Sequence, residues 1–66
     1  MEQIYIAIGT LRDFDGGIKT KVIGARRDKD KAAHIGHLWV VQENEANKSL
    51  GLKVHASYNL IRTPLI

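Results

Sequence analysis

The sequence predicts an α+β domain with a ββαβ layout, in which three strands form an antiparallel or mixed sheet and one helix packs on one face. Three observations lead to this prediction. Residues Ile4–Leu11 and Leu52–Leu60 alternate with the period of two typical of strands, and Asp28–Leu50 has the period of a helix. Because 66 residues leave room for one core, residues 1–66 are expected to form a single domain.

The first half of the chain predicts a β-hairpin. Both faces of Ile4–Leu11 are apolar, which favours a central strand, and we expect its isoleucines to face the helix. The segment Asp13–Gly17 (DFDGG) predicts a turn, since Asp accepts turn hydrogen bonds and Gly adopts positive φ. A second strand is expected from about Ile18 to Arg26, with Ile18 and Val22 inward and its lysines outward.

The segment Asp28–Leu50 carries an apolar stripe at helical spacing. The stripe consists of Ala32, Ile35, Trp39, Ala46 and Leu50, with Leu38 at its edge. Asp28 or Asp30 is suited to cap the first turn, and Gly51 to end the last. Against a helix, Gly36 costs about 1 kcal/mol relative to Ala. The composition of Leu38–Val41 also suits a strand, and the alternative fold is then a small all-β barrel.

The third strand follows Gly51 and ends at Pro64, which cannot donate a ladder hydrogen bond. A right-handed crossover makes it parallel to the second strand, so the expected order is second, first, third. The helix should then cover one face and leave the other open. Residues expected on the open face are Tyr5, Lys19, Lys21, Ile23, Lys53 and His55. Because an open face and free strand edges favour association, we expect a homodimer or a protein partner.

The charge of the chain favours anionic partners. Ten Lys and Arg against seven Asp and Glu give +3, and residues 19–31 alone hold six basic and two acidic residues. The candidate partner-binding residues are Tyr5, Lys19, Lys21, Arg26, Arg27, Lys29, Lys31, Lys53 and His55. An ordinary solvated surface is the alternative interpretation of these charges.

The chain contains no cysteine, no apolar run near 18 residues and no basic signal-peptide region at its start. These absences predict a cytoplasmic protein without a membrane span or disulfide.

Motifs for chemistry are weak, so we expect no catalytic residue, no cofactor and no bound metal. His34 and His37 have a spacing that zinc accepts on a helix, but a site needs further ligands, and surface histidines are the simpler interpretation. Asp13 and Asp15 begin like a calcium loop, but Gly24 stands where the bidentate Glu belongs. Neither a nucleophile motif nor a carboxylate pair predicts an enzyme.

The segments IYIAIGTLRDFDGG, IKTKVIGARRDKDKAA and ASYNLI together resemble the layout of small ββαβ proteins from phages and mobile elements. Several phage anti-CRISPR and other anti-defence proteins are similar in size and architecture. The resemblance implies a non-catalytic inhibitor that occupies a functional surface of a protein or ribonucleoprotein complex in the host cytoplasm. Many such proteins are acidic DNA mimics, whereas a basic chain fits an acidic surface, or nucleic acid within its target.

The alternative function is a small basic nucleic-acid-binding protein that uses the open sheet face. Tyr5 there would stack on a base while Lys19, Lys21 and Lys53 contact phosphates.

Overall fold

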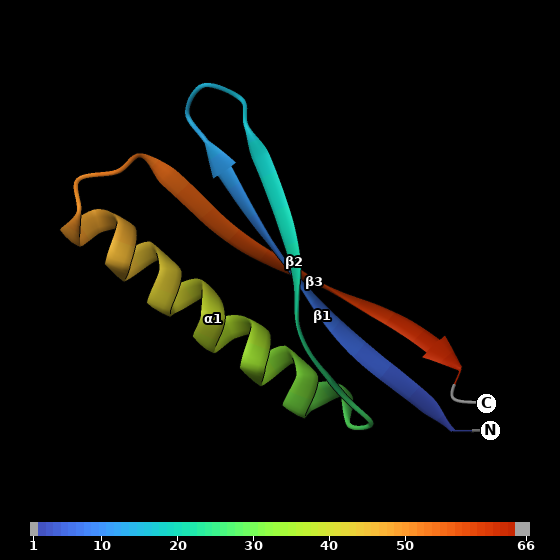
Figure 1. The fold of residues 1–66 in the computed structure, drawn as a ribbon. Coiled ribbons are helices and arrows are strands. Elements are labelled where there is room, and N and C mark those ends of the chain that lie inside the picture. Colours follow the sequence, from blue (N-terminus) through green and yellow to red (C-terminus); the bar gives the residue numbers. More distant parts are fainter. Residues whose placement is uncertain (1, 65–66) are drawn as a thin grey trace.

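The computed structural model describes residues 2–64 and has the predicted ββαβ order. The elements are β1 (Gln3–Asp13), β2 (Ile18–Arg26), α1 (Lys29–Ser49) and β3 (Val54–Pro64) (Figure 1). The ambiguous segment Leu38–Val41 lies within α1, and the sheet is open. The α+β prediction is therefore confirmed, and the barrel alternative is wrong.

The sheet has the predicted order β2-β1-β3, with β1 in the centre. Both neighbours pair with β1 in the antiparallel sense, so β2 and β3 run in the same direction on its two sides. One residue of β2, Ile23, has no register partner on β1, because Ala7 pairs with Gly24 and the next residue, Ile8, pairs with Val22. This β-bulge places both Ile23 and Gly24 on the helix side of the sheet.

The ends of α1 follow from local chemistry. The Asp28 side chain accepts hydrogen bonds from the backbone N–H groups of Asp30 at 2.8 Å and Lys31 at 3.3 Å. These bonds satisfy donors that the first turn leaves free. At the other end, Gly51 has φ +72° and its N–H donates to the carbonyl of Lys48. Both predicted helix signals are confirmed.

The prediction of which β1 side chains face the helix was wrong. Ala7 and Gly9 are buried, and a Cβ added to Gly9 would lie 2.6 Å from the ring of Trp39. Since side chains alternate along a strand, Ile4, Ile6 and Ile8 point to the side of the sheet away from α1. Val22 pairs with Ile8 and lies on that same side, contrary to its predicted inward position.

The small face of β1, not its isoleucine face, is buried because of the limited space between α1 and the sheet. The space between α1 and the sheet is filled by a few large side chains that lie directly against glycines. Trp39 lies over Gly9, Ile35 over Gly24 and the Tyr58 ring over Gly36. The small residues of β1 let the helix approach closely, which three isoleucines in that row would prevent. Gly36, a weakness in the helix prediction, is therefore a packing requirement, and Trp39 is part of the core as predicted.

The buried stripe of α1 also differs from the predicted one. Its buried residues are Ala32, Gly36 and Trp39, whereas Ala46 and Leu50 are exposed. The C-terminal half of the stripe is polar instead. There the Asn44 side-chain carbonyl accepts a hydrogen bond at 3.0 Å from the Ala56 backbone N–H of the edge strand β3. The helix thus satisfies an edge-strand amide that would otherwise be free to pair with another strand.

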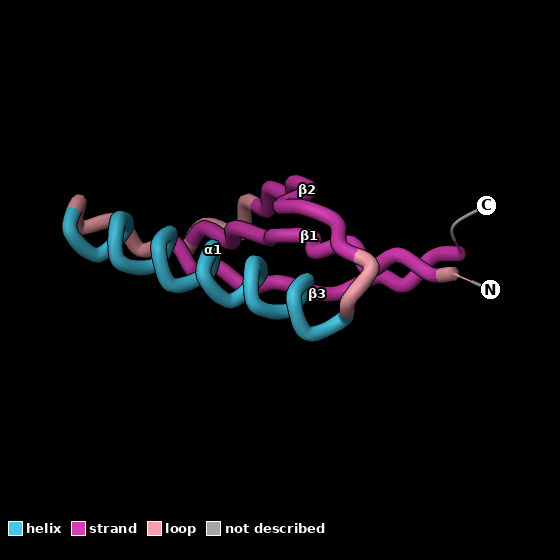
Figure 2. The backbone as a smooth tube through the Cα atoms, turned by 90° about the horizontal axis from the view of Figure 1, so that it is seen from below, coloured by secondary structure: helices cyan, strands magenta, loops and turns pink. Residues whose placement is uncertain are grey.

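The molecule is thin and long, with extents of 45 × 20 × 10 Å. For residues 2–64, Figure 2 shows α1 on one side of the sheet and no element on the other, while β1 and β3 continue beyond the start of α1 as a two-stranded ribbon. Within residues 2–64, the buried apolar residues are Ala7, Ala32, Trp39 and Ala56. Trp39 is therefore the one large side chain among these buried residues, and Ile35 and Tyr58 pack beside it while partly exposed.

Candidate partner-binding surfaces

A hollow of about 240 Å³ lies at the start of α1, between the helix and the ribbon formed by β1 and β3. It is lined by Tyr5 of β1, Lys29 of α1, and Leu60 and Arg62 of β3. The sheet register accounts for this grouping, because Tyr5 pairs directly with Arg62, and Ala7 with Leu60. Lys29 joins them as the first residue of the helix. Two cations and one aromatic ring from three elements thus surround the hollow.

Further cations belong to the same end of the molecule. Arg26 is the register partner of Tyr5 on β2, and Arg27 and Lys31 belong to the connection and the first turn of α1. We call Tyr5, Arg26, Arg27, Lys29, Lys31 and Arg62 the basic end. Its five cations exceed the three carboxylates nearby in the chain, Glu2, Asp28 and Asp30, by two charges.

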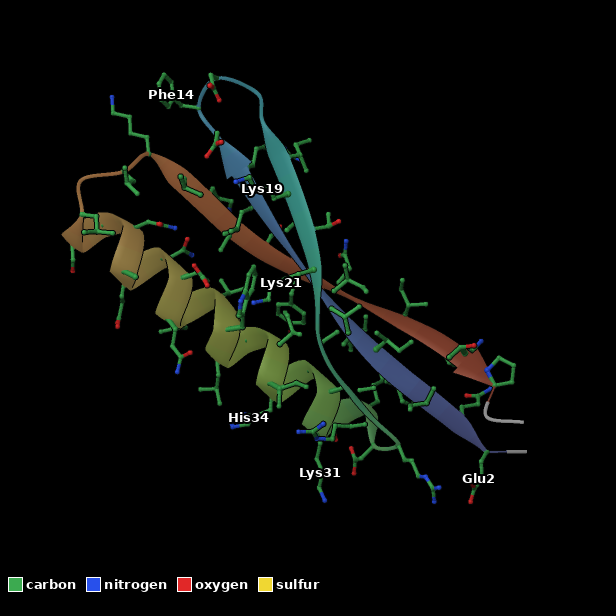
Figure 3. All side chains as sticks on the ribbon, in the orientation of Figure 1. Glu2, Phe14, Lys19, Lys21, Lys31 and His34 are labelled. Carbon is green, nitrogen blue, oxygen red and sulfur yellow. The ribbon has the colours of Figure 1, made fainter. Side chains whose placement is uncertain are left out.

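Little holds these charges in fixed ion pairs. Arg27 lies 3.7 Å from the Glu2 carboxylate, and both side chains are largely exposed, so solvent screens the attraction. Asp28 is occupied with capping the helix. Figure 3 shows Lys31 pointing away from the sheet into solvent. The basic end therefore presents exposed cationic side chains that are available to an anionic partner.

The other predicted partner-binding residues do not join this surface. Lys53 follows the C-terminal end of α1, and a 21-residue helix is about 30 Å long. His55 pairs with Arg12 near the hairpin, where Lys19 also lies. Lys21 lies midway along β2, opposite Gly9. The nine predicted residues are thus spread along the molecule, with Tyr5, Arg26, Arg27, Lys29 and Lys31 gathered at the basic end.

The predicted location of Tyr5 was also wrong. It lies on the helix side of the sheet, as do Lys19 and Lys21 by register with Leu11 and Gly9. Of the residues predicted for the open face, His55 is the one whose register places it there. Arg62 was not among the predicted partner-binding residues, although the sequence contained a signal for its position. The alternation through Tyr58 and Leu60 continues to Arg62, which places it on the same face as both.

The face of the sheet away from α1 forms a second surface, which we call the open face. It consists of Ile4, Ile6, Ile8, Thr10, Ile18, Thr20, Val22, Ala25, Ser57, Asn59, Ile61 and Thr63. None of these side chains carries a charge, and the charged or titratable Arg12 and His55 lie at its hairpin end. Ile18, Val22 and Ile61 are 58%, 63% and 51% exposed. This is a broad apolar surface whose border is polar and uncharged except at the hairpin end, where Arg12 and His55 lie.

The histidine and acidic motifs do not converge on a metal centre. Within residues 2–64, no three His, Cys, Asp or Glu side chains are grouped closely enough to hold an ion. His34 points away from the sheet, while Phe14 lies at the hairpin tip (Figure 3). The Asp13–Gly17 segment forms the predicted turn: the Asp13 N–H donates to the Gly17 carbonyl at 2.8 Å, and Gly16 has φ +92°.

Among the described residues, α1 lacks the apolar length that a membrane-crossing helix needs.

Comparison with protein-family models, with curated proteins and with solved structures finds no match to this chain. Arguments about function therefore depend on the two surfaces themselves.

Proposed function

We propose that this protein is a non-catalytic binding protein that inhibits a larger protein or ribonucleoprotein complex by covering an acidic surface of it. This is the mode of action implied by its resemblance to phage anti-defence proteins. The observation that carries the proposal is the hollow at the basic end, where β1, α1 and β3 bring together Tyr5, Lys29 and Arg62.

The chemistry of the basic end suits recognition of carboxylates or phosphates. Arg62 offers a planar fork of N–H donors that binds either group in a bidentate manner, and Lys29 adds a compact charge. Tyr5 contributes a half-buried ring with a hydroxyl group, and tyrosine and arginine are enriched among the residues that dominate binding energy. Charge complementarity at such a surface raises the association rate and selects the partner.

A pair of charge reversals tests the proposal. The tagged protein and its variants are expressed in the natural host, and the co-purifying complex is then reassembled from purified components and assayed for inhibition. Lys29→Glu combined with Arg62→Glu should abolish both stoichiometric binding and inhibition. The matched control combines Lys53→Glu with Lys19→Glu, which changes the net charge equally at the hairpin end and should retain both. Equal losses in the two double variants would refute a specific role for the basic end.

A small nucleic-acid-binding protein is the second candidate, and the same hollow favours it. A half-buried tyrosine between Lys29 and Arg62 matches the stacking ring and phosphate contacts of single-strand binders. The open face, which carries no charge on twelve residues, does not suit that role.

Fluorescence anisotropy with single- and double-stranded oligonucleotides distinguishes the two functions. A nucleic-acid binder should show an affinity that falls steeply as salt is raised, and Lys29→Glu should lower that salt dependence. Absence of binding at low salt would eliminate this candidate and leave the protein-binding function.

A further inference from the structure

We infer that the open face is the interface of a homodimer, in which two copies of this chain stack their sheets face to face with the helices outside. This inference concerns a surface that the proposed function does not use. It follows from the area the chain exposes, from the chemistry of the open face and from the small size of the core.

The exposed area is larger than one folded chain of this mass should have. The structure exposes 5041 Å². A monomeric protein of 7.4 kDa is expected to expose about 4,200 Å². The excess of about 800 Å² equals the area that each partner contributes to a standard interface. The radius of gyration of 13.3 Å likewise exceeds the value of about 11 Å for a compact domain of this length.

The open face is the part of the surface suited to bury that area. Ile6, Ile8, Val22 and Ile61 adjoin one another across the three strands by register. β-branched side chains standing on a sheet interdigitate with those of a second sheet about 10 Å away, as in β-sandwiches. With 26% of the chain charged, a face with no charge on twelve residues is a local departure from the rest of the surface.

A second copy is the occupant that this chemistry favours. A two-fold interface brings the same surface of both copies together, so a charge near the two-fold axis would meet its like. The open face avoids this, because its one arginine neighbour, Arg12, lies at the hairpin end. With the strands of the two copies antiparallel, Arg12 of one chain lies over the Ile4 end of the other. An acidic partner would gain nothing from such a face, whereas two apolar rows complement one another.

The small core gives an independent reason for a permanent partner. Trp39 is the one large side chain among the buried apolar residues of the described chain. A domain of this size has about 3–5 kcal/mol of stability from its core, and this chain has neither disulfides nor a metal cluster within residues 2–64 to add to it. A second copy of the chain is present whenever the protein is made. It can therefore always bury the apolar surface that the small core leaves exposed.

A matched pair of lysine substitutions tests the dimer. Val22 is 63% exposed on the open face, and Val41 is 39% exposed on α1. Wild type and Val41→Lys should sediment at twice the 7.4 kDa chain mass, and Val22→Lys at the mass of one chain. A wild-type monomer at millimolar concentration would overturn the inference. So would a folded Val22→Lys dimer, which would indicate pairing through a strand edge or the helix.

A cross-linking experiment keeps the test decisive if Val22→Lys fails to fold. The chain has no native cysteine, so Val22→Cys and Val41→Cys each carry a single thiol. A flexible bis-maleimide should join two copies of Val22→Cys in high yield and few copies of Val41→Cys. Equal yields, or cross-linking of Val41→Cys alone, would overturn the face-to-face arrangement.

Discussion

Gly36→Ala gives a direct test of how α1 meets the sheet. In an ordinary helix interior, alanine is more favourable than glycine by about 1 kcal/mol. Here a Cβ at position 36 would lie 2.5 to 2.9 Å from three atoms of the Tyr58 ring. Ordinary contacts begin near 3.4 Å, so the ring or the helix has to move by about 1 Å.

The magnitude follows from the two opposing effects. Inserting a methyl group into a packed core costs about 1–3 kcal/mol, which exceeds the gain in helix propensity. We therefore expect a net destabilisation of about 1 kcal/mol. For a domain of this size, that corresponds to a fall in melting temperature of about 4–8 °C. Helix propensity alone predicts the opposite result, namely that Gly36→Ala stabilises the protein.

Thermal and urea unfolding, followed by circular dichroism at one fixed protein concentration, measure the effect. The fixed concentration is needed because the proposed dimerisation would make stability concentration-dependent. Ala46→Gly is the control, since Ala46 is exposed on the same helix and reports the propensity difference alone. In a Tyr58→Ala background stabilised with osmolyte, Gly36→Ala should become favourable. If Gly36→Ala stabilises the wild type by as much as Ala46→Gly destabilises it, Tyr58 does not pack on Gly36.

Three further substitutions test local interactions. Asp28→Ala should lower the free energy of unfolding by about 1 kcal/mol, because two backbone donors of the first turn lose their acceptor, and Asp28→Ser should restore most of it in urea titrations. Asn44→Ala should speed hydrogen exchange at the Ala56 amide, whereas Gln42→Ala, at an exposed position of α1, should leave that rate unchanged; equal rates in both variants would contradict the edge-capping role. Gly51→Ala should cost about 1–2 kcal/mol in thermal unfolding because φ is +72°, and Gly51→Asn should cost less, since asparagine tolerates that region; equal losses would argue against the left-handed cap.

The grouping of residues at the candidate site could be predicted from sequence only in part. The excess of basic residues between Lys19 and Lys31 is visible in the sequence, and five of the nine predicted residues do gather at one end of the molecule. The separation of Lys53 from Lys29 depends on the length and direction of α1. The contribution of Arg62 depends on the β1–β3 register, which joins residues 57 positions apart in the chain, Tyr5 and Arg62. Local patterns contain no information about such a pairing.

Local chemistry in the sequence was enough to predict the elements and their order, except that Leu38–Val41 was left open between helix and strand. Asp28 and Gly51 delimit α1, Asp13–Gly17 makes the hairpin turn, and the alternating runs make the strands, because each depends on hydrogen bonds and dihedral angles within a few residues. The tertiary structure alone decided which face of β1 is buried. Both faces of that strand are apolar, so hydrophobicity cannot choose between them. The choice depends on volume: Trp39 fits over Gly9, and the isoleucines are left to the open face.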